Sequence, residues 1–359
     1  MRKTPRVTIT LVATALTSAA LSLVGPIAPA SAAGVLLYSN GGLNPVAAST
    51  SGVAAPAGYY WSEAQHDVAV PSVANTTGHK VEHGEYRQAD DFTVPAGQAW
   101  TIDSVDVVGF ASTDTAAPII GATLRIWSGV PGASGSRVVF GDPSTNRLRS
   151  SVDTHVYRIA DSTGGAAPEP PDTMRKMYLN SLAVAGVTLP GGTYWIDYDL
   201  TATGSLTAAS PTLTIPGSRG VAGWNARIAE VGGWRGLIDA GYPLSGADVP
   251  QDIPFNVNGT VTYPAPDTSF GKTPKSKMTK KKVDFSFSSD QAGATFQCSL
   301  NGAAFAACAG KVTVKGTKGK NTLIVRAVSA YGVADATPAA YTWKYKKKKK
   351  HPHHGGGGY

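Results

Sequence analysis

Short runs of alternating apolar and polar residues, separated by chain breakers, constrain this fold more than any other sequence feature. The clearest run spans residues 194–200. Because strand side chains alternate between two faces, it would carry Tyr194, Ile196, Tyr198 and Leu200 on one side and Trp195, Asp197 and Asp199 on the other. Gly (41) and Pro (24) are plentiful, and long apolar runs with a helical period are absent. The pattern predicts an all-β protein made of sandwiches rather than an α/β sheet.

Two such modules are expected. Residues 33–263 form the first, with strands predicted around 35–38, 91–94, 105–107, 123–127, 194–200 and 255–261 and a turn at Pro95-Ala96-Gly97. Pro264-Ala265-Pro266 is the expected linker. Residues 264–345 form a smaller module of at least five short strands, for which an immunoglobulin-like sandwich is the economical architecture. Its clearest strand would direct Val283, Phe285 and Phe287 inward.

The second module contains the only two cysteines, Cys298 and Cys308, on either side of Asn301-Gly302. The cysteines lie ten positions apart, behind an N-terminal segment (residues 1–32) with the features of an export signal, and this favours a small-loop disulfide over a metal or catalytic site. An ideal two-residue hairpin at Asn301-Gly302 would place Phe305 opposite Cys298. The chain is therefore expected to bend after Phe305 to bring the cysteines together.

The first 32 residues have the order of a secretory signal peptide. Three basic residues within 1–6 precede an apolar run at 7–24, and Ala30-Ser31-Ala32 provides a cleavage site. The alternative is an uncleaved anchor. No other stretch is apolar enough to span a bilayer. The expected location is extracellular, with the protein released or held loosely at the envelope.

Charge divides the chain into two parts. Residues 33–263 contain 12 Lys and Arg against 20 Asp and Glu, whereas residues 264–359 contain 17 against 4. The basic excess ends in a tail at 346–359, which is read either as a disordered solvated segment or as an attachment to an anionic envelope polymer. The predicted polyanion contacts are Lys344, Lys346, Lys347, Lys348, Lys349 and Lys350. Nucleic acid would satisfy the same charge, but an exported protein meets wall polymers first, so no specific nucleic-acid partner is expected.

Both modules resemble known secreted bacterial domains. Residues 265–344 resemble immunoglobulin-like modules, through 283–289 (VDFSFSS), 294–302 (ATFQCSLNG) and 305–308 (FAAC). That resemblance implies a spacer or adhesion module in which the two cysteines pair. Residues 36–261 are similar to an uncharacterised family, through 89–97 (ADDFTVPAG), 124–127 (LRIW) and 192–197 (GTYWID). This second resemblance implies a jelly-roll-like sandwich in an extracellular protein and supplies no catalytic residues.

Two carboxylate pairs are candidates for chemistry. Asp90 and Asp91 at a strand entrance could bind Ca²⁺, or could serve as a turn cap and an inward polar contact. Asp197 and Asp199 share a strand face and could act in glycoside hydrolysis, or could be an ordinary solvent-facing alternation. His79 and His83 have a zinc-like spacing, but glycines bracket them and favour a loop. No cofactor is expected, unless Asp90 and Asp91 bind calcium.

A Gly-rich region supplies a candidate ligand-binding set consisting of Trp224, Arg227, Trp234 and Arg235. Exposed tryptophans can stack on sugar rings and arginines can bind acidic groups, although such tryptophans often close the end of a sandwich instead. Together these features predict a secreted, non-enzymatic binding or surface-interaction protein whose partner is a glycan or an anionic wall polymer. The alternatives are an extracellular polysaccharide hydrolase and a purely structural envelope protein.

Overall fold

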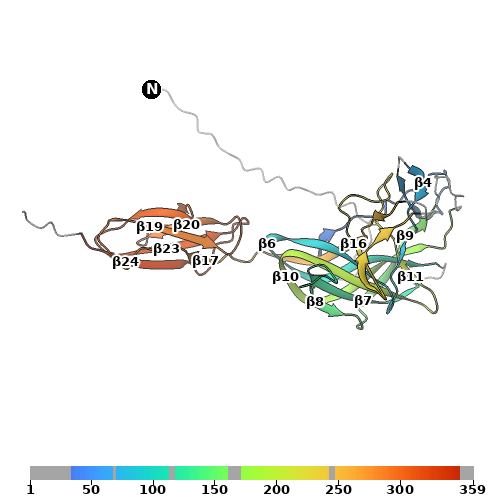
Figure 1. Cartoon of the computed structure of the whole chain (residues 1–359), viewed down its shortest axis with the longest axis horizontal. Helices are drawn as coiled ribbons and strands as arrows, with labels where there is room; N and C mark the ends of the chain where they lie inside the picture. The colour runs from blue at the N-terminus through green and yellow to red at the C-terminus, as the bar shows by residue number, and fades with distance from the viewer. Residues whose placement is uncertain (1–33, 68–69, 113–117, 161–170, 242–246, 348–359) are drawn as a thin grey trace, which may run out of the picture.

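The computed structural model describes residues 34–67, 70–112, 118–160, 171–241 and 247–347. All secondary-structure elements in these ranges are strands, and they form two modules that follow one another along the chain (Figure 1). The predicted signal segment and residues 348–359 of the predicted tail lie outside the described residues. Within the described ranges, no helix is long and apolar enough to cross a membrane.

Two long strands form the frame of the first module. β6 (Arg87–Ala111) and β10 (Lys176–Ala202) pair antiparallel along most of their length. The register shifts where the segment after Val94 faces Pro190 to Gly192, which makes a bulge there. The predicted turn at Pro95-Ala96-Gly97 lies in this irregular segment, where Gly97 has a φ of 78°, but β6 does not end there and continues to Ala111.

Shorter strands flank each half of this ribbon. Beside the second half of β6 and the first half of β10 lie β1 (Val35–Ser39), β16 (Phe255–Thr262), β9 (Leu148–Ile159) and β2 (Tyr60–Glu63). Beside the other half lie β7 (Ile119–Ser128), β8 (Arg137–Asp142), β12 (Arg227–Glu230) and β13 (Gly233–Gly236). The short pairs are β3 (His66–Asp67) with β4 (Val70–Ala74), β5 (His79–Lys80) with β11 (Ala208–Ser210), and β14 (Ile238–Asp239) with β15 (Val249–Pro250).

One hydrophobic cluster joins the two halves of the ribbon. It contains Val107 and Val257 from one half together with Leu124, Ile196 and Tyr198 from the other. The ribbon therefore serves both layers of a single sandwich, with the core between them. The predicted inward face of residues 194–200 is confirmed, since Tyr194, Ile196, Tyr198 and Leu200 are all buried.

The second module packs two sheets against each other. One contains β17 (Thr268–Phe270), β19 (Lys282–Ser289) and β22 (Lys311–Lys315). The other has the order β18 (Lys277–Met278), β24 (Ala339–Tyr345), β23 (Gly319–Val328), β20 (Thr295–Leu300) and β21 (Ala306–Cys308). Their core contains the predicted inward face of β19, namely Val283, Phe285 and Phe287. The predicted fold class, a larger sandwich followed by a smaller immunoglobulin-like one, is confirmed.

The modules touch at the junction beside the linker. The ring of Tyr331 from the second module lies 4.6 Å from that of Tyr263, centroid to centroid. The Tyr331 hydroxyl accepts a hydrogen bond of 3.1 Å from the Gln98 side chain, which belongs to the bulge of β6. A Cβ at the neighbouring Gly97 would lie 3.1 Å from the Tyr331 ring, so this position favours glycine both for contact and for its φ of 78°. The bulge of the ribbon is thus the docking point for the second module.

Candidate functional site

Lysines gather at the end of the second module that lies farthest from the linker. Backbone hydrogen bonds bring three segments together there: Lys344 donates to Ser276, Lys346 to Met278, and Gly316 to Lys281, over 2.7 to 2.9 Å. The segments carry ten lysines, all exposed: Lys277, Lys280, Lys281, Lys282, Lys315, Lys318, Lys320, Lys344, Lys346 and Lys347. We call this set the lysine pole.

A buried asparagine shapes one part of the lysine pole. Asn321 is 1% exposed, and its Oδ1 accepts a 2.7 Å hydrogen bond from the backbone of Thr317. Its Nδ2 donates to the carbonyls of Thr317 and Gly319 at 2.8 and 3.1 Å. The loop that carries Lys315, Lys318 and Lys320 is therefore held in one conformation by internal contacts.

The carboxylates of the second module lie elsewhere. Asp267 and Asp290 are bonded to each other next to the linker, where the Asp267 N–H donates to Asp290 Oδ1 at 2.8 Å. Asp335 lies at the same end, with its N–H on the Ala327 carbonyl. Asp284 accepts a 2.7 Å bond from the Thr313 hydroxyl, outside the lysine pole. Across the described ranges, no pole lysine forms an ion pair with a carboxylate, so the module is basic at one end and acidic at the other.

The structure places the predicted polyanion contacts only in part. Lys344, Lys346 and Lys347 belong to the lysine pole, whereas Lys348, Lys349 and Lys350 lie outside the described residues. The sequence reading did not include the lysines of the 315–320 loop. The lysines at 315, 318 and 320, just before the strand at 323–327, were the available signal, but their place beside Lys344 depends on strand pairing.

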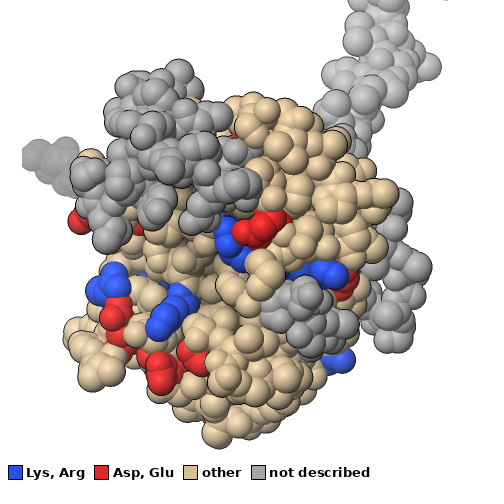
Figure 2. Space-filling model, turned by 90° about the vertical axis from the view of Figure 1, so that its right-hand side faces the viewer, with Lys and Arg blue, Asp and Glu red and all other residues tan. Residues whose placement is uncertain are grey.

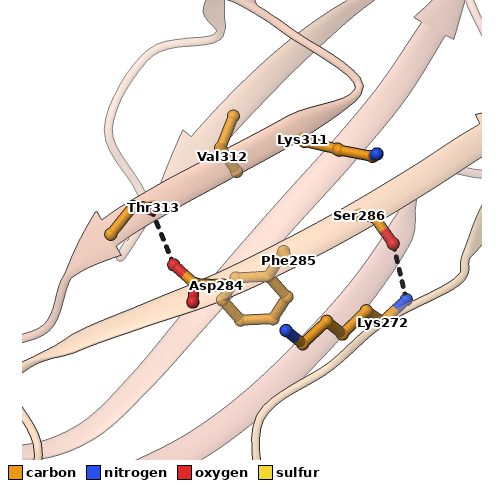
Figure 3. Close-up of a pocket in the computed structure, with 7 residues that line it drawn as sticks. All are labelled: Lys272, Asp284, Phe285, Ser286, Lys311, Val312 and Thr313. Carbon is orange, nitrogen blue, oxygen red and sulfur yellow. Dashed lines mark hydrogen bonds between the residues drawn. The ribbon is translucent and has the colours of Figure 1, made fainter.

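An open pocket of about 360 Å³ lies on the outer side of β19 and β22. Figure 3 shows the side chains of Lys272 and Lys311 at its rim, with Ser286 between them. The Ser286 hydroxyl accepts a 2.8 Å hydrogen bond from the Lys272 backbone N–H. The pocket therefore presents two ammonium groups and one carboxylate, Asp284, on a face different from that of Lys344.

The predicted disulfide between Cys298 and Cys308 is confirmed, with the two Cα atoms 5.9 Å apart. The ladder places Ala306 opposite Cys298, so the expected pairing with Phe305 is off by one residue. Asn301 and Gly302 both have positive φ, and the Ala303 N–H donates to the Leu300 carbonyl at 3.2 Å, which closes a two-residue turn. One extra residue follows the turn within 303–305, and this bulge explains the shift. A loop of this length should stabilise the module by about 3 kcal/mol. Such disulfides persist in oxidising surroundings, which favours an extracellular location.

The outward face of β10 differs from the expectation of solvent exposure. Asp197 and Asp199 are 0% and 1% exposed. The Arg87 guanidinium contacts both carboxylates, and Arg125 Nε lies 2.6 Å from Asp197 Oδ2. His83 Nδ1 lies 3.1 Å from Asp199 Oδ1. The solvent-facing interpretation is wrong because arginines from β6 and β7 cover and neutralise the pair.

This burial also removes support for glycoside hydrolysis. A hydrolytic carboxylate pair must flank a substrate in a cleft, whereas these two are enclosed by cationic partners. The adjacent pocket, about 260 Å³, is lined by His83, Ile120, Gly121, Ala122, Thr123, Ser144, Asn146 and Thr201. None of these described lining residues is a carboxylate, so the pocket lacks the pair that the reaction needs.

The predicted calcium pair splits between two environments. Asp90 is 1% exposed and accepts hydrogen bonds from the Asn40 amide at 2.8 Å and the Ile253 N–H at 2.9 Å. Asp91 is only half-buried. Among the described residues, no group of three or more His, Cys, Asp or Glu is placed to hold a metal ion. Asp90 therefore acts as the inward polar contact that was the alternative, and calcium binding stays a prediction.

Asp90 should make the stability of the first module depend on pH. Burial, and then the Asp252 carboxylate, raise the pKa of Asp90 well above its ordinary value near 4. Its protonated form therefore favours folding below that ordinary value, and this contribution is lost as pH rises through the raised folded pKa. Asp90→Asn cannot lose this proton. We expect urea unfolding to show the variant gaining stability relative to the wild type as the pH rises from about 4 through the raised pKa of Asp90; parallel curves would contradict this.

The remaining candidates do not converge. His79 lies 3.7 Å from Asp239 and His83 lies 3.1 Å from Asp199, so each histidine faces a different carboxylate. On the β12–β13 hairpin, Trp234 lies opposite Ala229 while Arg235 lies opposite Ile228, so the two side chains point to opposite faces.

The arginines of this set are already bonded within the hairpin. The Arg227 guanidinium donates to the Trp234 carbonyl at 3.2 Å, and Arg235 pairs with Glu230. Trp224 lies in a separate turn and is half-buried. The four residues thus do not form one platform, and ligand binding there stays a prediction. Figure 2 shows the end of the first module that faces away from the second, where basic and acidic groups lie side by side on a largely uncharged surface.

Comparisons with known proteins leave the function open. No known family matches the chain, and no curated protein matches it. Fibronectin(III)-like modules of CbhA from Clostridium thermocellum align with 74% of this chain and 100% of their own, at 11% identity and a TM-score of 0.21. The adhesin domain of Epf from Streptococcus pyogenes aligns over 73% and 74%, at 9% identity and a TM-score of 0.23. Likeness at these scores carries no argument, so the fold rests on the sheet topology described above.

Proposed function

We propose that this protein is an extracellular, non-enzymatic binding protein that attaches to an anionic polymer of a cell envelope through its lysine pole. One observation carries the proposal: ten exposed lysines converge at one end of the second module without a carboxylate partner in the described chain. A concentrated field of one sign attracts polyanions and raises their rate of association. Neither calcium nor a catalytic residue is needed for this function.

A polymer fits the lysine pole better than a small ligand does. The lysines come from three segments and all of their side chains are exposed, so they present an extended charged surface. Attraction of this kind weakens with salt, because the Debye length is about 8 Å at physiological ionic strength. Binding should therefore be weakly selective and strongly salt-dependent. The tail at 348–359 continues from the same end of the module and would add to the same field.

Co-sedimentation with cell-wall fragments tests the function. The full mature chain is mixed with Gram-positive wall fragments that retain their anionic polymer, and with fragments from which acid treatment has removed it. We expect the protein to sediment with the first preparation at 50 mM salt and to be released over several tenths molar salt. Stripped fragments should retain little protein.

Two results would contradict the proposal. Equal binding to stripped fragments would mean that the protein binds the glycan itself, with Trp224 and Trp234 as the candidate contacts. Binding that does not change with salt would exclude an electrostatic attachment. A truncation that lacks residues 348–359 measures the share of the tail, because it leaves the described lysine pole intact.

A further inference from the structure

We propose that a row of three lysines, Lys277, Lys344 and Lys320, is the primary contact for the polymer and that it fits closely spaced phosphate groups. This inference rests on the proposed function and assigns it to one face of the lysine pole. The row crosses three adjacent strands, since Lys344 of β24 lies opposite Lys277 of β18 and opposite Lys320 of β23.

The row faces solvent. Trp343, the neighbour of Lys344 on β24, is 1% exposed and belongs to the core, so alternation directs Lys344 outward. Side chains of directly opposite residues project from the same face of a sheet. All three lysines are exposed, which agrees with this placement.

Protection of a sheet edge explains only one lysine of this row, Lys277 on the edge strand β18. Lysines on edge strands prevent sheets from pairing with other chains, and that reason suffices for Lys315 on β22, an edge strand. β24 and β23 are interior strands of their sheet, yet Lys344 and Lys320 lie directly opposite each other on them. Like charges in this position destabilise a sheet. A bound anion would remove that repulsion.

The spacing of the row favours a dense line of anions. Neighbouring strands lie about 4.8 Å apart, so three ammonium groups fall within roughly 10 Å along one line. Two residues along, Thr322 and Thr342 lie opposite each other on the same face, with their hydroxyls 3.0 Å apart. One of these hydroxyls donates to the other, so the O–H of the second is left to donate to a phosphate oxygen beside the lysines. A linear polymer with a phosphate in every repeat satisfies such a row, whereas a polysaccharide with one carboxylate per two sugars leaves lysines unmatched.

Two triple variants of the full chain test the assignment. Lys277→Gln, Lys320→Gln and Lys344→Gln together remove the row. The matched control, Lys282→Gln, Lys311→Gln and Lys315→Gln, removes the same charge from the β19–β22 sheet, including one lysine of the Figure 3 pocket. Binding of long-chain inorganic polyphosphate and of hyaluronate is measured by fluorescence anisotropy across a salt series. Thermal unfolding of each variant confirms that it is folded.

The row variant should bind polyphosphate at least about tenfold more weakly at 0.1 M salt, and its salt slope should fall by about 2, near 0.7 for each lost contact. The control should lose about threefold or less, and hyaluronate should bind the wild type more weakly than polyphosphate does. Equal losses in the two variants, or a preference for hyaluronate, would overturn the row while leaving the proposed function in place. If the wild type binds neither polymer, the proposed function falls as well.

Discussion

Replacing Ile196 with aspartate should unfold the first module and leave the second one folded. Ile196 is 0% exposed, and its strand β10 is paired on both sides, with Asp90 of β6 and Ile126 of β7 at this position. The aspartate would lose the apolar contacts of the core and bury a charge without a partner. We expect a loss of more than about 4 kcal/mol from the buried charge and the lost packing together. This loss approaches or exceeds the whole unfolding free energy of a domain near the low end of the usual range of about 5 to 15 kcal/mol.

Near-UV circular dichroism and limited proteolysis measure this outcome. The first module should become protease-sensitive, while the second, which has its own core around Phe285 and Trp343 and its own disulfide, should remain resistant. Ile196→Val is the control, because it keeps the shape and should cost about 1 kcal/mol. A folded, protease-resistant Ile196→Asp protein would mean that Ile196 does not lie in the core of the first module.

The second large effect is expected at Asp197, on the opposite face of the same strand. Its carboxylate is 0% exposed and accepts hydrogen bonds from Arg87, Arg125 and Trp127. In Asp197→Asn the amide cannot balance two guanidinium groups, and its N–H₂ would face other donors. Breaking a buried ion pair on one side costs about 3 to 5 kcal/mol. We therefore expect the midpoint of urea unfolding of the first module to fall markedly.

Glu85→Gln provides the matched control for Asp197→Asn. It removes one negative charge two residues before Arg87, the partner of Asp197, but Glu85 is exposed and its replacement should change the stability by no more than about 0.5 kcal/mol. If the two variants unfolded at the same urea concentration, the carboxylate of Asp197 would not contribute to folding. If Asp197 were instead a catalytic residue, Asp197→Asn would lose turnover while the stability of the module stayed unchanged.

The segment 194–200 of β10 shows which features of the fold could be predicted from the sequence. Its apolar face was predictable because alternation is a local property, and Ile196 is buried as expected. Its polar face was not, because the partners of Asp197 and Asp199 are Arg87 and Arg125, which lie 72 to 112 residues away. A local pattern identifies a face but does not say what packs on it.

The lysine pole and the disulfide differ in how far apart their residues lie in the sequence. Cys298 and Cys308 are close in the sequence, so their pairing was predictable from spacing and compartment. Lys277, Lys320 and Lys344 are distant in the sequence, and only the pairing of β18, β24 and β23 makes them neighbours. The net charge of the module was evident from composition. The arrangement of three lysines in one row was not evident from the sequence, because the register of paired strands depends on the tertiary structure.

The separation of charge within the second module also determines how the protein would approach its target. Asp267 and Asp290 lie beside the linker while the lysines lie at the far end, so the module has a dipole moment along its length. In the field of a negatively charged surface, a dipole experiences a torque before contact is made. The lysine end would turn toward the surface. The first module, which contacts the second through Tyr331, would then face away from the surface in one orientation.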